Sequence, residues 1–157
     1  MQLLIQQRVF TWGDKYDVYD ERGDVRYYVE SEFFTIGHQI HVYDQRSGQE
    51  VGSIHQRLLT FTPEFDIVIR GRTVGTIRKR LTLFTPSYEV DFMGWDVEGD
   101  FLEWDYQVLQ GSHSVMDISK CWLSWGDTYA LTYQNIDDEI PGLLLVIAID
   151  AANCDRK

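Results

Sequence analysis

The stretch DDEIPGLLLVIAIDAA, residues 137–152, decides the fold of this chain. Its first acids suit a helix N-terminus, and Pro141 falls in the first turn, where a proline costs no hydrogen bond. The following residues are apolar on every side of a helix, and such a helix must be buried. We expect a core helix over about residues 138–152, with core positions Leu143, Leu144, Leu145, Val146, Ile147 and Ile149.

The apolar run is too short to span a membrane. Residues 140–149 would rise about 15 Å as a helix, roughly half of the ~30 Å hydrocarbon core of a bilayer. Glu139 and Asp150 close the run at both ends. We therefore predict a buried helix and no transmembrane segment.

The rest of the chain is rich in strand-forming residues. Trp, Tyr and Phe number 22 among 157 residues, an excess that favours β-structure. Alternating runs bounded by turn residues predict roughly twelve strands between about residues 3 and 133. Closing so many strands into a barrel removes their exposed edges. We expect one domain over residues 1–157, mainly β: a closed antiparallel barrel of about twelve strands around the buried C-terminal helix.

A segment of the chain repeats after 23 residues. VGSIHQRLLTFTPEFDI, residues 51–67, returns without a gap as VGTIRKRLTLFTPSYEV, residues 74–90, and a fainter copy covers residues 115–131. Because Thr-Pro cannot sit in a central ladder, each copy predicts a strand, a bend and a strand. Arg57 and Arg80 occupy matched positions, which favours a shared structural role such as satisfying carbonyls at the bend.

Charge and cysteine content narrow the class of protein. The formal net charge of −11 argues against nucleic-acid binding, because a phosphate backbone would be repelled. Such an acidic balance fits either the interior of a halophile or an ordinary acidic protein. Cys121 and Cys154 are too few for a disulfide framework, and the N-terminus has no signal-peptide pattern. We expect a cytoplasmic protein, peripheral to a membrane if it meets one.

The order of these motifs resembles a known family. The repeated Val-Gly-x-Ile and Phe-Thr-Pro units, residues 119–122 followed by 126–129, and the closing helix that ends at Asp150 are similar to the LURP-one-related family of the tubby C-terminal-like superfamily. Tubby domains and phospholipid scramblases are other branches of that superfamily. The resemblance covers nearly the whole chain and implies a twelve-stranded barrel around a C-terminal helix. The resemblance implies much less about activity, since tubby domains resemble phosphoinositide-binding modules, scramblase relatives act at membranes, and many LURP-one-related members have no assigned biochemistry.

The sequence gives little support for an enzyme, a cofactor or a metal site. It contains no nucleophile elbow, phosphate loop or His-Glu-x-x-His motif. His38 and His41 would point to opposite faces of a strand. A solvated strand face explains the acidic residues between 96 and 105 better than a calcium loop does. Packing between barrel and helix is the favoured use of four tryptophans, namely Trp95, Trp104, Trp122 and Trp125.

One local charge feature opposes the acidic balance. Arginine and lysine gather in one region and form a candidate site for an anion: Arg57, Arg70, Arg72, Arg78, Lys79 and Arg80. A hairpin across Gly71 would place Arg70 and Arg72 at the turn, about 20 Å from residues 78–80, so one headgroup could not meet both groups. Arg78 and Lys79 would face opposite sides of their strand.

Two functions fit this sequence. The first is a non-enzymatic module that binds anionic phospholipid or another phosphorylated ligand at the barrel surface. The second is a soluble scaffold for protein–protein interaction or regulation, without a small-molecule ligand.

Overall fold

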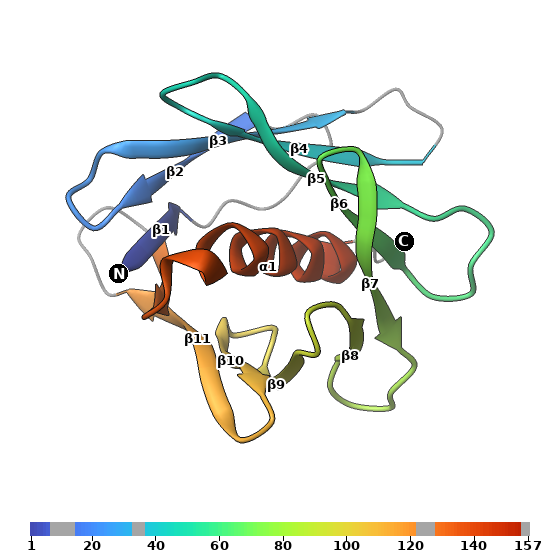
Figure 1. The fold of residues 1–157 in the computed structure, drawn as a ribbon. Helices are drawn as coiled ribbons and strands as arrows, with labels where there is room; N and C mark the ends of the chain where they lie inside the picture. The colour runs from blue at the N-terminus through green and yellow to red at the C-terminus, as the bar shows by residue number, and fades with distance from the viewer. Residues whose placement is uncertain (7–14, 33–36, 122–127, 155–157) are drawn as a thin grey trace.

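The computed structural model describes residues 1–6, 15–32, 37–121 and 128–154. Within these ranges, twelve strands form one antiparallel sheet that curves round a long helix (Figure 1). The strands are β1 (Gln2–Gln6), β2 (Lys15–Asp20), β3 (Val25–Glu32), β4 (Gln39–Asp44), β5 (Glu50–Gln56), β6 (Glu64–Ile69), β7 (Arg72–Arg80), β8 (Ser87–Asp91), β9 (Asp96–Asp100), β10 (Asp105–Gln110), β11 (His113–Cys121) and β12 (Thr128–Tyr133). A 3-10 turn, η1 (Ile136–Asp138), leads into α1 (Glu139–Cys154).

Neighbouring strands in the sequence are mostly neighbours in the sheet, whose order is β8-β7-β6-β5-β4-β3-β2-β1-β12-β11-β10-β9. Strand β1 joins the two halves because it pairs with β12, with Leu3 opposite Leu131. Antiparallel order sends the connections to alternate ends of the barrel. The β5–β6 and β7–β8 loops therefore leave the same end, at the right of Figure 1, beside the C-terminal end of α1. We call this the loop end.

The twelve strands form a nearly closed barrel, which confirms the predicted fold class. Strands β8 and β9 end the sheet and lie next to each other, but no ladder joins them among the described pairings. Aromatic side chains fill the seam instead. The Tyr88 and Phe101 rings lie 4.9 Å apart, and the Phe92 and Trp95 rings 5.6 Å apart, each pair edge to face. The first pair packs β8 against the residue that follows β9, and the second lies in the connection between these two strands.

The helix occupies the interior of the barrel, as the sequence predicted. All residues from Leu143 to Ile149 are at most 1% exposed, and the inward side chains of the strands pack around them. The helix begins at Glu139, one residue after the expected start, and ends at Cys154, two residues after the expected end. Among the described residues, no helix has the length and apolarity that crossing a bilayer requires.

The matched glycines of the repeat allow two close approaches. A Cβ atom on Gly52 would lie 2.5 Å from Cδ1 of Leu144, so β5 approaches the helix at this point. A Cβ atom on Gly75 would lie 2.6 Å from Cβ of Phe92 and 2.7 Å from the backbone oxygen of Asp91. Gly52 therefore allows the helix to pack closely against β5, and Gly75 allows Phe92 to pack closely against β7.

Leu145→Asp should unfold the barrel. Leu145 is 0% exposed, and a buried carboxylate without a partner costs several kcal/mol, against a typical total stability of about 5–15 kcal/mol. Leu81→Asp is the matched control, because Leu81 is 87% exposed and the same chemical change there should leave the melting temperature unchanged. Thermal unfolding followed by circular dichroism measures both. An unchanged cooperative melt for Leu145→Asp would contradict the buried helix.

Gly75→Ala should destabilise the fold more than Gly52→Ala. The new methyl at residue 75 meets a backbone oxygen that cannot move freely, whereas at residue 52 it meets the end of a leucine side chain. We expect losses of about 2–3 and about 1 kcal/mol respectively, within the usual range for overpacking. Urea unfolding of the two variants gives the comparison, and equal or reversed losses would show that these contacts do not set the packing.

Candidate functional site

The two copies of the sequence repeat build the loop end. Strand β5 ends at Gln56 and β6 begins at Glu64, while β7 ends at Arg80 and β8 begins at Ser87. Each intervening loop finishes on the Thr-Pro pair, so the predicted strand, bend and strand are observed. The backbone N–H of Lys79 donates to the carbonyl oxygen of Pro63 at 3.0 Å, and residues of both loops line one shallow pocket of about 390 Å³. The loops therefore lie side by side.

These loops carry large apolar side chains that the search for a site in the sequence missed. Leu59 and Phe61 are as exposed as in an extended chain, and Leu83 and Phe84 are more than 90% exposed. Leu58 and Leu81 add to the set, at 56% and 87%. The repeat itself was the available signal, since Leu, Phe, Thr and Pro recur at matched positions without a turn pattern that would require them.

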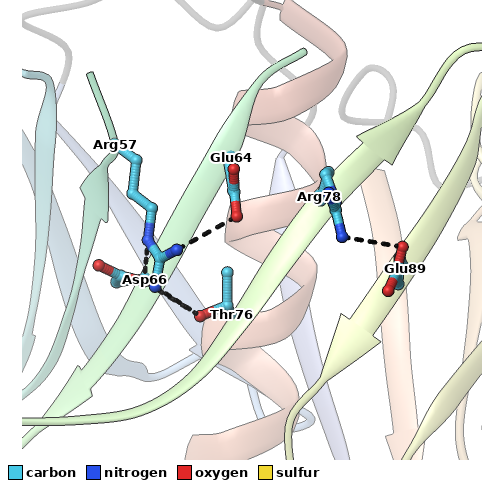
Figure 2. Close-up of polar contacts among 6 residues, drawn as sticks. All are labelled: Arg57, Glu64, Asp66, Thr76, Arg78 and Glu89. Carbon is cyan, nitrogen blue, oxygen red and sulfur yellow. Dashed lines mark hydrogen bonds and ion pairs between the residues drawn. The ribbon is translucent and has the colours of Figure 1, made fainter. Parts of the chain in front are cut away.

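Arg57 stands at the start of the first loop and is bound by the neighbouring strand (Figure 2). Its Nε lies 2.9 Å from Oδ1 of Asp66 and its Nη1 lies 3.3 Å from Oε1 of Glu64, both on β6. Its Nη2 donates to the hydroxyl of Thr76 at 3.4 Å, and that hydroxyl donates to Asp66 at 3.1 Å. Arg57 therefore fixes the base of its loop through carboxylates, not through the carbonyls that we expected.

The second copy of the repeat has an equivalent arginine–carboxylate pair with a longer distance between its atoms. Arg80 Nε lies 3.9 Å from Oε2 of Glu89, and Glu89 matches Asp66 in the repeat. Arg78 reaches the same oxygen of Glu89 at 3.2 Å, as Figure 2 shows. One carboxylate therefore serves two guanidinium groups.

The loop end has local positive character although the chain is acidic. The region holds four cations, Arg57, Arg78, Lys79 and Arg80, and three acids on the adjoining strands, Glu64, Asp66 and Glu89, and ion pairs join the three arginines to these acids. The three arginine side chains keep 47–57% of their area exposed. Ion pairs this exposed contribute little stability and exchange partners readily. The guanidinium groups can therefore meet a phosphate from solution.

The remaining two predicted anion-site residues lie elsewhere. Arg70 and Arg72 flank Gly71 in the tight turn between β6 and β7, and Arg70 takes a left-handed conformation with φ of 53°. Eight residues of extended strand separate Arg72 from Arg80, about 26 Å. The structure thus divides the predicted set into a loop-end group and a turn pair, as the hairpin geometry indicated.

The histidines and tryptophans considered as site residues are the next to be placed. His41 lies between Glu32 and Glu50 on the outer face, and the described residues contain no group of three or more His, Cys, Asp or Glu side chains placed to hold a metal. Trp95 and Trp104 are buried in the core. Trp122 and Trp125 lie outside the described residues.

A second feature missed by the sequence is a buried polar cluster at the other end of the helix. The carboxylate of Glu139, 3% exposed, accepts hydrogen bonds from Arg26 Nε and from the hydroxyls of Tyr27 and Tyr133. From the sequence, Glu139 was only the acid that closes the apolar run, but in the structure it ties α1 to β3 and β12. Asn135 caps η1 instead, accepting from the N–H of Asp137 at 3.0 Å.

This cluster perturbs the pKa values of its members. Burial, and then the hydrogen bond to Glu139, raises the pKa of Tyr27 and of Tyr133 well above the ordinary tyrosine value. The hydrogen bond to Glu139 raises the pKa of Arg26. All three groups therefore hold their protons in the folded protein.

A nearly closed twelve-stranded antiparallel barrel around a buried C-terminal helix defines this protein as a tubby-like barrel. The chain belongs to the LURP-one-related family, whose model matches residues 1–150. It is 31% identical over 150 residues to the uncharacterized protein YxjI of Bacillus subtilis (strain 168), covering 96% of this chain and 92% of that protein. An X-ray structure of a protein from Arabidopsis thaliana shares the fold, with a TM-score of 0.64 and 15% identity over 96% of this chain and 90% of that one.

Stability should fall in alkaline solution because of the tyrosines around Glu139. Unfolded tyrosines ionise near their ordinary pKa of about 10, whereas folded Tyr27 and Tyr133 stay protonated, so above that pH the unfolded state binds fewer protons. Their contribution is complete below about pH 10 and is lost as the pH rises through the folded pKa values. Melting temperatures between about pH 8 and pH 11 measure this slope.

The double variant Tyr27→Phe with Tyr133→Phe supplies the control for this slope. It should have a shallower alkaline decline than the parent protein, although some decline remains because burial also raises the pKa of Tyr106. Equal slopes in the two proteins would contradict the role given to the cluster.

Proposed function

We propose that this protein is a non-enzymatic binding module that recognises the phosphate groups of an anionic phospholipid surface, or of another phosphorylated ligand, with the cations of its loop end. The observation that carries the proposal is the sharing of Glu89 by Arg78 and Arg80, both half-exposed at the base of the apolar loops. In this proposal residues 1–157 act as one domain in the cytoplasm, peripheral to a membrane.

The chemistry of the arginines supports a phosphate ligand. A guanidinium group has five N–H donors in a fixed fork that matches two phosphate oxygens. Arg78 and Arg80 both approach a single oxygen of Glu89, which cannot satisfy two such groups. A phosphate placed over this pair would complete their hydrogen bonds without breaking the contact with Glu89.

The net negative charge of the chain repels an anionic surface, but this repulsion acts mainly through acids that lie far from the loop end. The Debye length is about 8 Å at physiological ionic strength, so acids elsewhere on the barrel are largely screened from the loop end. The charges that matter for binding are therefore those of the local group, which holds four cations and three acids. Binding should therefore need this local group and should weaken with added salt.

The described side chains at the loop end are better suited to binding a ligand than to catalysing a reaction. They supply guanidinium and ammonium charge, carboxylates, the His38 imidazole, threonine hydroxyls and apolar groups. Membership of the LURP-one-related family supports a binding role without specifying the ligand. The alternative function is a protein-interaction scaffold, and the exposed apolar side chains of the two loops favour it, because such side chains also form the centres of protein interfaces.

Arg78→Gln with Arg80→Gln should weaken binding to anionic vesicles by about tenfold at low salt, because each cation near such a surface contributes roughly 1 kcal/mol and Glu89 offsets part of it. Flotation with vesicles of phosphatidylcholine and phosphatidylserine measures the change. Competition with soluble inositol phosphates distinguishes the two kinds of ligand. If the protein recognises a free phosphorylated ligand, a low concentration of inositol phosphate should displace it from the vesicles; if it recognises a lipid surface, a low concentration should not.

Two controls sharpen the vesicle experiment. Arg70→Gln with Arg72→Gln removes the same charge from the far turn and should leave binding almost unchanged. Glu89→Gln removes the shared acid and should strengthen binding several-fold. If the far pair mattered as much as Arg78 and Arg80, binding would reflect net charge alone and the site would be wrong. Parent protein that floats with no vesicle and binds no phosphorylated competitor would leave the scaffold as the function.

A further inference from the structure

The two apolar loops are unusual for a protein in water. Six leucine and phenylalanine side chains project from residues 57–63 and 81–86, and four of them are more than 90% exposed. Apolar side chains gathered at one end of a soluble protein are a feature of surfaces that bind a protein or a membrane. Leu59 adopts a left-handed backbone with φ of 59°, a conformation that non-glycine residues take rarely. We therefore expect these exposed side chains to be covered by a binding partner.

We propose that both loops insert their apolar side chains into the hydrophobic region of a phospholipid bilayer, with the loop end of the barrel facing the membrane. This inference rests on the proposed function, because it concerns the same end of the barrel and the same lipid surface. It adds a second, apolar contribution to binding that salt does not screen.

The charge pattern of the loops fits a bilayer. Neither loop contains an acid, although acids outnumber bases by 25 to 14 in the chain. Arg57 opens the first loop, and Lys79 and Arg80 directly precede the second. Apolar tips above cationic bases match the depth profile of a membrane surface, in which hydrocarbon lies beneath anionic headgroups.

The shape of the loops also favours a bilayer over a rigid partner. Exposures near 100% mean that the side chains of Leu59, Phe61 and Leu83 pack against almost nothing of their own chain. A protein partner would need a separate pocket for each side chain. A fluid hydrocarbon phase surrounds each of them without any such match, and loops of six or seven residues suffice to reach about 5–10 Å into the interface.

The repeat gives the two loops equivalent roles. Phe61 and Phe84 occupy matched positions, one at each tip, and the hydrogen bond from Lys79 N–H to Pro63 holds the loop bases together. Two adjacent insertion points fix the orientation of a barrel on a surface better than one. Removing one phenylalanine should therefore weaken membrane binding, and removing both should weaken it much further.

Phe61→Ser with Phe84→Ser tests the insertion. On vesicles of phosphatidylcholine and phosphatidylserine in molar salt, where electrostatic attraction is screened, the parent protein should still float. The variant should bind at least about a hundredfold less, because burying one such side chain changes an equilibrium by about tenfold or more. Both phenylalanines are about fully exposed, so the melting temperature of the variant should equal that of the parent.

Met93→Ser with Ile136→Ser is the matched control. These side chains are about half-exposed, and neither lies in the two loops, so their loss should leave vesicle binding unchanged. Arg78→Gln with Arg80→Gln should reduce binding only at low salt. These differences separate the apolar contribution from the electrostatic one.

Three results would overturn the insertion. The first is parent protein that binds anionic vesicles at low salt and releases them completely in molar salt, which would leave the proposed function standing alone. The second is unchanged flotation of the Phe61→Ser, Phe84→Ser variant in molar salt. The third is parent protein that floats with no vesicle but self-associates in sedimentation through these phenylalanines, which would make the loops a contact between copies and remove the proposed function as well.

Discussion

Burial of one helix that is apolar on all sides is the constraint on which this structure depends. A helix with a polar face can lie on a sheet, but α1 has no face that water can meet, and Leu143 to Ile149 are almost fully covered. Only a sheet that curves nearly the whole way round can supply such a cover. The strand order, the β1–β12 pairing that joins the two halves, and the close approach of Gly52 to Leu144 all serve this enclosure.

The enclosure also separates the two ends of the barrel. At one end, Glu139 ties the start of the helix to β3 and β12 through Arg26, Tyr27 and Tyr133. At the other end, the repeat places two loops beside each other with arginine–carboxylate pairs at their bases. The first end is held by buried polar bonds that resist change, and the second by exposed ion pairs that can exchange partners. This difference is the reason that we propose recognition at the loop end.

The fold could be predicted from the sequence because its main signals are local. The helix is apolar all round, and each Thr-Pro pair breaks a strand, so residue types alone indicated a barrel around a helix. The open seam could not be predicted, because β8 and β9 alternate like the other strands and no residue type marks them as the ends of the sheet. The role of Glu139 could not be predicted, because its partners on β3 lie more than a hundred positions away in the sequence.

The candidate site was visible in part. The hairpin geometry correctly separated Arg70 and Arg72 from residues 78–80, but the acids that pair with the loop-end arginines become neighbours only through the sheet register. The apolar loop residues were hidden because leucine and phenylalanine between strands look like core residues, and only the three-dimensional path of each loop exposes them.

Flotation of the unmodified protein with neutral and anionic vesicles, over a salt series from low to molar, tests the central claim most directly. The loop end as a membrane-binding surface predicts strong binding to anionic vesicles at low salt that declines with salt and then levels off above zero. Folded protein that stays with neither kind of vesicle at any salt concentration would contradict it.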